Sequence, residues 1–394
     1  MSQLVRKSLG NIFKIARGGS PRPIQSFLTD DSDGLNWIKI GDAVEGSKYI
    51  TTTKQKIRKE GLNKSRLVDV GDFLLTNSMS FGRPYILKIS GCIHDGWLVL
   101  SPKDSNAHSD FFYYLLGSDF IFREFTKRAA GAVVKNLNID LVKSVEIPLP
   151  PLEEQKRIAG ILDAADALRA KRRETLEQLD QLAQSTFLEM FGDPVTNPKG
   201  WEVSDMLEVC NKITDGTHHS PPICDEGVPY ITAKHLKKDG LKFFDNPWFI
   251  SADDHTEIFN RCDPSRGDVL YIKDGATTGI AAINYYEFEF SMLSSLALLK
   301  PKSKLITSEY LCAFLNNERN KSHLTNNMGG AAIKRFTLAK IKKFQIPLPP
   351  LPLQKEFASI IESIEKQKER VKAHLEELDT LFSSLQSRAF KGEL

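Results

Sequence analysis

The chain repeats itself with a period of 199 residues, and this repeat limits its possible folds more than any other feature of the sequence. The hexapeptide Ile147–Leu152, Ile-Pro-Leu-Pro-Pro-Leu, recurs unchanged as Ile346–Leu351. A period this long is typical of two copies of one module rather than of a solenoid, and it predicts pseudo-twofold symmetry within one chain. Further matches at nearly the same spacing are Gly131–Lys135 with Gly330–Lys334, Leu176–Asp180 with Leu375–Asp379, Phe191 with Phe390, Gly192 with Gly392, and Gly71–Leu74 with Gly267–Leu270.

Each module begins with a mixed region of about 150 residues. Apolar runs between turn residues, such as Tyr85–Ile89 and Val269–Ile272, predict strands. Asp110–Phe125 and Ser308–Asn316 carry aromatic and Leu residues at helical spacing and predict helices. The proline-rich hexapeptide then ends the region as an extended connector, because proline lacks an N–H and disfavours helix in the residue before it.

A long helix is predicted after each connector, since neither residues 161–191 nor 353–391 contain Gly or Pro. Apolar positions recur in both at alternating steps of four and three, which is typical of a coiled-coil seam. We expect the two helices to pair antiparallel, with the small Ala183 and Thr186 matched to the bulky Phe382 and Leu385. Two unrelated amphipathic helices on separate cores are the alternative. The seams are Ile158, Leu162, Ala165, Arg169, Arg172, Leu176, Leu179, Ala183, Thr186 and Met190, and Phe357, Ile361, Ile364, Lys368, Val371, Leu375, Leu378, Phe382, Leu385 and Ala389.

The predicted fold class is therefore α+β, with two similar globular domains separated by two long paired helices. The expected boundaries are a first recognition domain at 1–150, a central helix at 151–192, a second recognition domain at 193–350 and a C-terminal helix at 351–394. Arg169, Arg172 and Lys368 place charges within the seams, which favours a wet or partner-binding middle.

Composition indicates a cytoplasmic protein. The sequence has no apolar run of about 18 residues and no apolar segment after Met1, so neither a membrane span nor a secretory signal is expected. Its five cysteines are scattered and form no Cys-x-x-Cys pair, which predicts reduced thiols rather than disulfides or a zinc site. Residues 1–150 hold 21 Lys and Arg against 15 Asp and Glu, consistent with phosphate contacts.

No motif predicts catalysis. Adenine methyltransferases need an Asp/Asn-Pro-Pro-aromatic loop for a flipped base, and the nearest string, Ser220–Ile223, lacks the aromatic residue. Glu154-Gln155-Lys156 resembles a nuclease triplet but lies where a helix begins, and acidic residues are favoured there. No phosphate-binding Gly-rich motif occurs, and His218-His219 has no further metal ligand at the required spacing.

Two similar heads on a stiff helical spacer suit a target that repeats at a fixed distance, as DNA half-sites do. Because the heads differ in sequence, the two half-sites should differ as well. Base reading favours Arg for guanine and Asn for adenine, while phosphates are bound by Lys, Arg and hydroxyl groups. The expected DNA-binding residues lie in polar loops: Arg17, Ser20, Arg22, Asn77, Ser78, Arg83, Lys135 and Asn136 in the first half, and Thr217, His218, His219, Lys273, Thr277, Thr278, Lys334 and Arg335 in the second.

The chain resembles the specificity subunits of type I restriction–modification systems. The resemblance rests on the two proline-rich connectors, on Glu153–Ile158 at the start of the first helix, and on Phe191–Pro194 followed by Asn197–Trp201. It covers essentially the whole chain. One departure is Leu351–Gln354, where the second copy lacks the Glu-Glu pair of the first.

The resemblance implies a non-catalytic subunit of a bacterial or archaeal cell that reads a bipartite, asymmetric site on double-stranded DNA. It implies that the long helices dock two adenine-methyltransferase subunits and that restriction subunits join the assembly. S-adenosylmethionine, ATP and Mg²⁺ would then be used by those partners and not by this chain. A scaffold with two protein-binding heads and a self-contained nuclease or methyltransferase are the alternatives.

Overall fold

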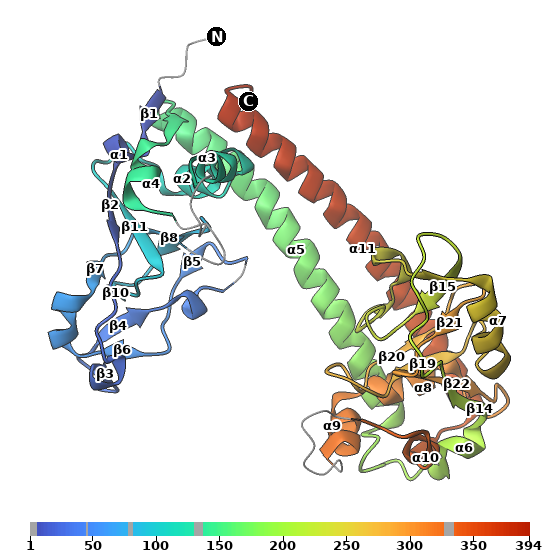
Figure 1. Cartoon of the computed structure of the whole chain (residues 1–394). Coiled ribbons are helices and arrows are strands. Elements are labelled where there is room, and N and C mark those ends of the chain that lie inside the picture. The colour runs from blue at the N-terminus through green and yellow to red at the C-terminus, as the bar shows by residue number, and fades with distance from the viewer. Residues whose placement is uncertain (1–5, 45, 78–81, 130–136, 327–334) are drawn as a thin grey trace. The chain divides into compact units, whose positions relative to one another are not determined.

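The computed structural model describes residues 6–44, 46–77, 82–129, 137–326 and 335–394. It divides into a first unit, residues 1–173 and 373–394, and a second unit, residues 174–372. Each unit therefore takes its globular part from one copy of the repeat and one half of each long helix. The two helices, α5 (Leu152–Phe191) and α11 (Leu351–Lys391), are each continuous (Figure 1).

The first unit is a layered α+β structure. One sheet has the strand order β2-β11-β8-β9-β5, a second has the order β3-β6-β4-β10-β7, and β1 pairs with β12. The strands are β1 (Arg6–Ser8), β2 (Phe13–Arg17), β3 (Leu28–Thr29), β4 (Leu35–Ile38), β5 (Tyr49–Ile50), β6 (Lys56–Ile57), β7 (Arg66–Val68), β8 (Phe73–Thr76), β9 (Pro84–Leu87), β10 (Gly91–Ile93), β11 (Trp97–Pro102) and β12 (Glu146–Pro148). The helices of its globular part are α1 (Leu9–Ile12), α2 (Ser109–Leu116), α3 (Asp119–Ala129) and α4 (Ile139–Ser144), with 3₁₀ turns at Ile24–Ser26, Ile40–Asp42 and Lys59–Lys64.

Alternation along the strands of the first unit explains its two cores. Side chains point to opposite faces of a strand in turn. In β8, Phe73 and Leu75 join a core with the helices, whereas Leu74 joins a core with the second sheet. In β11, Leu98 and Val99 divide between the same two cores. The sheet is therefore covered by helices on one face and by the second sheet on the other.

The second unit repeats this plan. Its sheets have the orders β14-β22-β19-β20, β18-β15-β21 and β16-β17, and β13 pairs with β23. The strands are β13 (Glu202–Asp205), β14 (Cys210–Asp215), β15 (Val228–Ile231), β16 (Leu236–Lys237), β17 (Gly240–Leu241), β18 (Phe249–Ile250), β19 (Val269–Ile272), β20 (Ala281–Ile283), β21 (Ser291–Met292), β22 (Leu296–Pro301) and β23 (Gln345–Leu348). The helices are α6 (Met206–Val209), α7 (Ala252–Arg261), α8 (Ser308–Asn316), α9 (Glu318–Asn326) and α10 (Leu338–Lys342), with a 3₁₀ turn at Phe243–Asp245.

The long helices pack antiparallel within each unit. In the first unit, the Arg169 Nε donates to Asp379 at 2.6 Å, and the Arg169 guanidinium lies 4.3 Å from the Phe382 ring centroid. In the second unit, Lys368 Nζ lies 2.7 Å from Asp180. All predicted seam positions are buried or half-buried. The antiparallel pairing and the internal repeat are therefore confirmed.

Both helices end in the same way. Gly192 follows α5 with φ +80°, and Gly392 follows α11 with φ +77°. This left-handed conformation is the usual helix C-cap and favours glycine because it lacks a Cβ.

Three sequence expectations need correction. The helix predicted over Asp110–Phe125 is two helices, α2 and α3, separated at Gly117 and Ser118, because Gly117 ends the first helix. The strand predicted over Tyr85–Ile89 is β9, Pro84–Leu87. The size match of Ala183 and Thr186 with Phe382 and Leu385 is wrong, because the antiparallel register places Phe382 beside Arg169 instead.

The proline-rich connectors are extended, as predicted, and each also pairs with the first strand of its own module. Ile147 pairs with Lys7, and Ile346 pairs with Ser204. Each connector therefore closes its globular part just before the long helix begins. Among the described residues, no helix is long and apolar enough to cross a membrane.

Candidate nucleic-acid interface

In the first unit, two of the predicted loops and one turn that was not predicted meet at one end of the sheet. Strands β2 and β8 both end beside the beginning of β11, since Leu98 pairs with Arg17 and Trp97 pairs with Thr76. The loops after β2 and β8 and the turn before β11 therefore lie together. A Cβ on Gly18 would collide with the His94 carbonyl oxygen, so this close approach needs glycine.

Asp95, in the turn before β11, is the centre of a polar cluster. The Ser20 hydroxyl donates to its carboxylate at 2.7 Å, and His94 Nε2 lies 3.0 Å from the same oxygen. The Arg17 Nε and the Asn77 amide both donate to the Asp95 carbonyl oxygen, at 3.1 and 2.8 Å. These residues, Arg17, Ser20, Asn77, His94 and Asp95, are called the Asp95 cluster below.

The pKa of Asp95 is lowered from its ordinary value of 3.8. The hydrogen bond from Ser20 is the main cause, and the charges of His94 and Arg17 add to it against the opposing effect of burial. The carboxylate therefore stays ionised and acts as an acceptor only. The side chain of Asn77 is buried, whereas that of Arg17 is exposed, so Arg17 is the cation that the cluster presents to solvent.

The remaining first-half candidates lie around this cluster or outside the described residues. Arg22 is exposed in the loop after β2, and Arg83 is exposed just before β9, which begins at the same end of the sheet. Ser78, Lys135 and Asn136 lie outside the described residues.

The second unit has the same frame. Asp215 ends β14 and pairs with Ala297, and Ile272 at the end of β19 pairs with Leu296. Gly216 approaches the Met292 carbonyl oxygen too closely for any Cβ, just as Gly18 approaches the His94 carbonyl oxygen in the first unit. The backbone N–H of Lys273 donates to Ser295, as that of Asn77 donates to Gly96.

Asp215 is the centre of the corresponding polar cluster. Its side chain is buried, and it forms an ion pair with the buried Lys273 at 3.4 Å. The Arg261 Nη2 donates to the other carboxylate oxygen. His218 Nε2 lies 3.5 Å from Asp215 and 3.3 Å from Arg261 Nη2. These four residues are called the Asp215 cluster below.

The other second-half candidates surround the Asp215 cluster. Thr217 is held by backbone bonds to Met292 and Ser294, and its hydroxyl accepts from the His219 N–H at 3.1 Å. Thr277 is exposed. Two further candidates have local partners: Thr278 is buried and donates to Gly275, and Arg335 Nε lies 3.2 Å from Asp274. Lys334 lies outside the described residues.

Sequence reasoning missed Asp95, His94 and Arg261. Arg261 is the last residue of α7, far along the chain from the loop that it reaches. No glycine-rich or repeated segment marks it. Only the folded arrangement brings it to Asp215.

Two of the three helix charges predicted to bind partners are engaged within the chain. Arg169 pairs with Asp166 and Asp379, at 2.7 and 2.6 Å. Lys368 is buried and pairs with Asp180 and Glu365, at 2.7 and 2.8 Å. Arg172 is half-buried.

Exposed leucines are a second feature of the long helices. Leu182 on α5 is 49% exposed, and Leu381 on α11 is 48% exposed. The two are 199 residues apart and therefore occupy equivalent places in the repeat. Leu168 and Leu188 on α5 are exposed as well.

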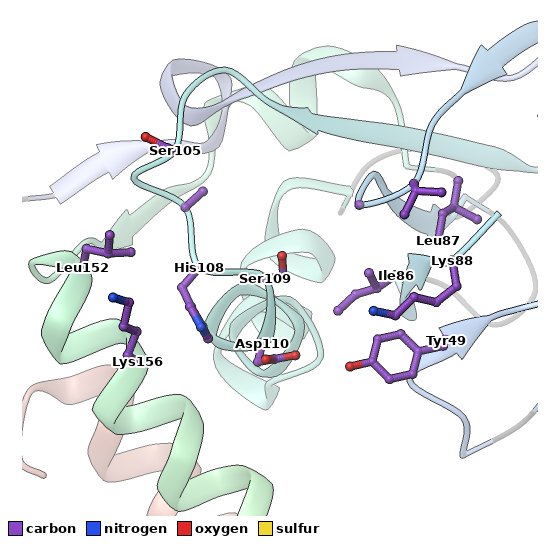
Figure 2. A pocket seen from close by; sticks show the side chains of 13 residues that line it. Tyr49, Ile86, Leu87, Lys88, Ser105, His108, Ser109, Asp110, Leu152 and Lys156 are labelled. Carbon is purple, nitrogen blue, oxygen red and sulfur yellow. The ribbon is translucent and has the colours of Figure 1, made fainter. Parts of the chain in front are cut away.

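A cleft of about 400 Å³ lies at the opposite end of the first unit's sheet from the Asp95 cluster (Figure 2). Lys88 lies over the Tyr49 ring at 4.5 Å, and Lys156 pairs with Glu153 at 2.8 Å. The two lysines that line the cleft therefore already have partners. Among the described residues, no group of side chains could hold a metal ion. The cleft is lined by Tyr49, Val70, Gly71, Ile86, Leu87, Lys88, Ser105, Ala107, His108, Ser109, Asp110, Leu152 and Lys156.

One protein-family model matches most of the chain. The family model of the type I restriction modification DNA specificity domain matches residues 1–178 and 198–380. The MjaIX specificity subunit of Methanocaldococcus jannaschii, a type I restriction enzyme subunit, is 24% identical over 91% of this chain and 86% of that protein. The EcoBI specificity subunit of Escherichia coli is 21% identical over 99% of this chain and 86% of that protein.

Solved structures show the same fold. A structure describing complex assembly and conformational transition of the type I R-M system contains a chain with a TM-score of 0.59 at 21% identity, covering 99% of this chain and 98% of that one. The S subunit of a type I restriction–modification system from M. genitalium has a TM-score of 0.55 at 15% identity, covering 99% and 97%. The α+β fold with a repeated module is therefore confirmed by comparison as well.

Proposed function

The chain belongs to the family of type I restriction–modification DNA specificity proteins, and from this premise we propose that each of its two units reads one half of a bipartite, asymmetric site on double-stranded DNA. The Asp95 and Asp215 clusters carry this proposal. They occupy the same place on the same frame, where loops from several strands meet, and binding residues collect on such loops. Their side chains differ, which supports two unlike half-sites.

The long helices set the spacer between the half-sites and dock two methyltransferase subunits. The exposed Leu182 and Leu381 support docking because they occupy equivalent places in the repeat, which suits two copies of the same partner. Arg169 and Lys368 stabilise the helix pair from inside, while Arg172 remains a candidate partner contact.

The chain itself is non-catalytic in this proposal. Its relatives are named specificity subunits, not methyltransferases or nucleases. S-adenosylmethionine, ATP and Mg²⁺ are used by the methyltransferase and restriction subunits that assemble with it. The site of action is the cytoplasm, where the DNA and these partners are found.

Mapping of methylated adenines in cells that express the chain with its methyltransferase partner tests the proposal. We expect one motif with two unlike parts separated by a fixed number of unspecified base pairs. A matched strain with the methyltransferase alone should lack this motif. A palindromic motif, or the same methylation with and without this chain, would contradict the proposal and favour the scaffold alternative.

A further inference from the structure

The two clusters share one backbone frame but carry different charges on it. At the end of the first strand of each ladder, the first unit has the cation Arg17 and the second has the anion Asp215. Directly after β8 the first unit has the neutral Asn77, and directly after β19 the second unit has the cation Lys273. The carbonyl oxygen of Asn77 accepts a hydrogen bond from the Leu137 N–H at 3.0 Å. The carbonyl oxygen of Lys273 accepts the equivalent bond from the Phe336 N–H at 2.7 Å.

The change from the cation Arg17 to the anion Asp215 argues against phosphate binding at that position. The DNA backbone is anionic everywhere, so a position that binds phosphate should keep a cation or a neutral donor in both units. A position that reads bases must instead change its donors and acceptors with the base. The changed side chains on an unchanged frame therefore indicate base reading.

In the second unit, the buried Lys273 is not the residue that reaches DNA. Its side chain is only 3% exposed, and its ammonium faces the Asp215 carboxylate. A buried charge needs a partner of opposite sign, and this pair supplies one for each group. Lys273 therefore neutralises Asp215 and fixes its position.

Arg261 is the group that Asp215 holds at the surface. Its side chain is 51% exposed, and in the described part of the chain its polar contacts, to Asp215 and His218, both run through Nη2. The Nε and Nη1 donors of the planar guanidinium remain for a ligand. A guanidinium held through Nη2 by a buried carboxylate is preorganised, and each remaining donor can give one hydrogen bond to O6 or N7 of guanine, the base that offers two acceptors on its major-groove edge.

We propose that Arg261 is the base-reading residue of the second unit, that its target is a guanine in the half-site of that unit, and that Asp215 is the positioning residue that orients it. This inference rests on the function proposed above and deepens it. It assigns a guanine to the half-site of the second unit.

The test is the methylated motif made by variants of the complete chain expressed with the methyltransferase partner. We expect the wild-type half-site of one unit to contain a guanine. Arg261→Ala and Arg261→Lys should both relax that one position, lowering discrimination for guanine about 10-fold or more while the other half-site and the spacer stay unchanged. Arg261→Lys keeps the charge but removes the planar set of donors, so relaxation in this variant reports base reading.

Asp215→Asn should relax the same position, and Asp215→Asn combined with Arg261→Ala should relax it no further. A merely structural role of Asp215 would lower all methylation without changing the motif. Arg266→Ala is the matched control, because Arg266 is an exposed arginine of the same unit that pairs with Glu287 at the other end of β19. It should leave the motif unchanged.

An unchanged motif in both Arg261 variants, with weaker methylation at every site and a smaller salt dependence of DNA binding, would identify a phosphate contact and overturn the inference. Relaxation at several positions of both half-sites would also overturn it. Either result leaves the proposed function intact. Failure of the wild-type chain to direct any bipartite motif would instead refute the proposed function itself.

Discussion

Two buried glutamines make the same hydrogen bonds in the two units. The Gln155 side chain accepts from His108 N–H and donates to the carbonyl oxygens of Asn106 and Pro150. Gln354, 199 residues later, accepts from Thr307 N–H at 3.0 Å and donates to Leu305 and Pro349, at 3.0 and 2.8 Å. Each glutamine therefore ties the start of a long helix to the loop before a shorter helix and to its own proline-rich connector.

Replacing Gln354 should destabilise the second unit. Gln354→Ala removes three hydrogen bonds and leaves backbone groups without partners in a buried place, so we expect the free energy of unfolding to fall by about 2–4 kcal/mol. Lys355→Ala, at the exposed neighbouring position, should cost about 0.5 kcal/mol or less. Urea unfolding followed by tryptophan fluorescence measures both, and equal losses would contradict the role of Gln354.

The pKa of Asp95 should change when the Ser20 hydroxyl is removed. Ser20→Ala removes the main cause of its lowered pKa, so we expect the pKa of Asp95 to rise toward 3.8. Because the folded pKa is depressed, the stabilisation by Ser20 is present above about pH 4 and is lost as the pH falls through the folded pKa. Carbon-13 NMR titration of the carboxyl group measures the shift. Ser26→Ala, in the exposed 3₁₀ turn nearby, is the control, and the same titration curve in both variants would contradict the assignment.

At the scale of elements, insertions can lengthen α5 and α11 without breaking their pairing only if the apolar positions of the seam still face each other. Inserting seven residues after Arg173 in α5 and seven after Lys372 in α11 adds two turns, about 10 Å, without rotating the seam. With about 3.4 Å per base pair along DNA, we expect the unspecified spacer of the methylated motif to grow by about three base pairs while both half-sites stay the same.

A five-residue insertion at the same two places is the control for this experiment. It adds length but turns the apolar seam away from its partner, so it should abolish methylation rather than lengthen the spacer. A motif with an unaltered spacer after the seven-residue insertion would contradict the proposal that the helices set it.

Helices and strands could be predicted from the sequence where a local residue pattern determines them. The two polar clusters could be predicted only in part. An apolar run between turn residues predicted β19 at Val269–Ile272, and the heptad steps predicted positions of α5 and α11 that are buried or half-buried. Glycine in polar loops marked Arg17 and His218 as candidate DNA-binding residues, and the structure places each of them in a polar cluster. The glycine pattern could not show that Lys273 is buried, because the burial comes from packing against Asp215. It also could not reveal Arg261, whose partner is 46 residues away in sequence.

At the scale of the whole molecule, equivalent surfaces should bind equivalent partners. Leu182→Glu or Leu381→Glu places a charge in one of two repeated contacts, so we expect each single variant to bind one methyltransferase subunit and the double variant to bind none. Native mass spectrometry of the purified complexes measures the stoichiometry. Val44→Glu changes an exposed apolar residue of a loop and should keep both partners. Two bound subunits in the double variant would contradict docking at these leucines.

The sharing of both helices between the units has a consequence for synthesis on the ribosome. The core of the first unit includes Phe382, Ala389 and Phe390. Phe382 and Phe390 contact Tyr114 and Phe111 of α2, and they are translated long after that helix. The N-terminal globular part therefore emerges with an open apolar face and waits for the second unit to be made. A nonsense codon or a stalled ribosome after Lys372 would leave all residues of the second unit translated. The first unit, although translated first, would lack residues 373–394 of its core.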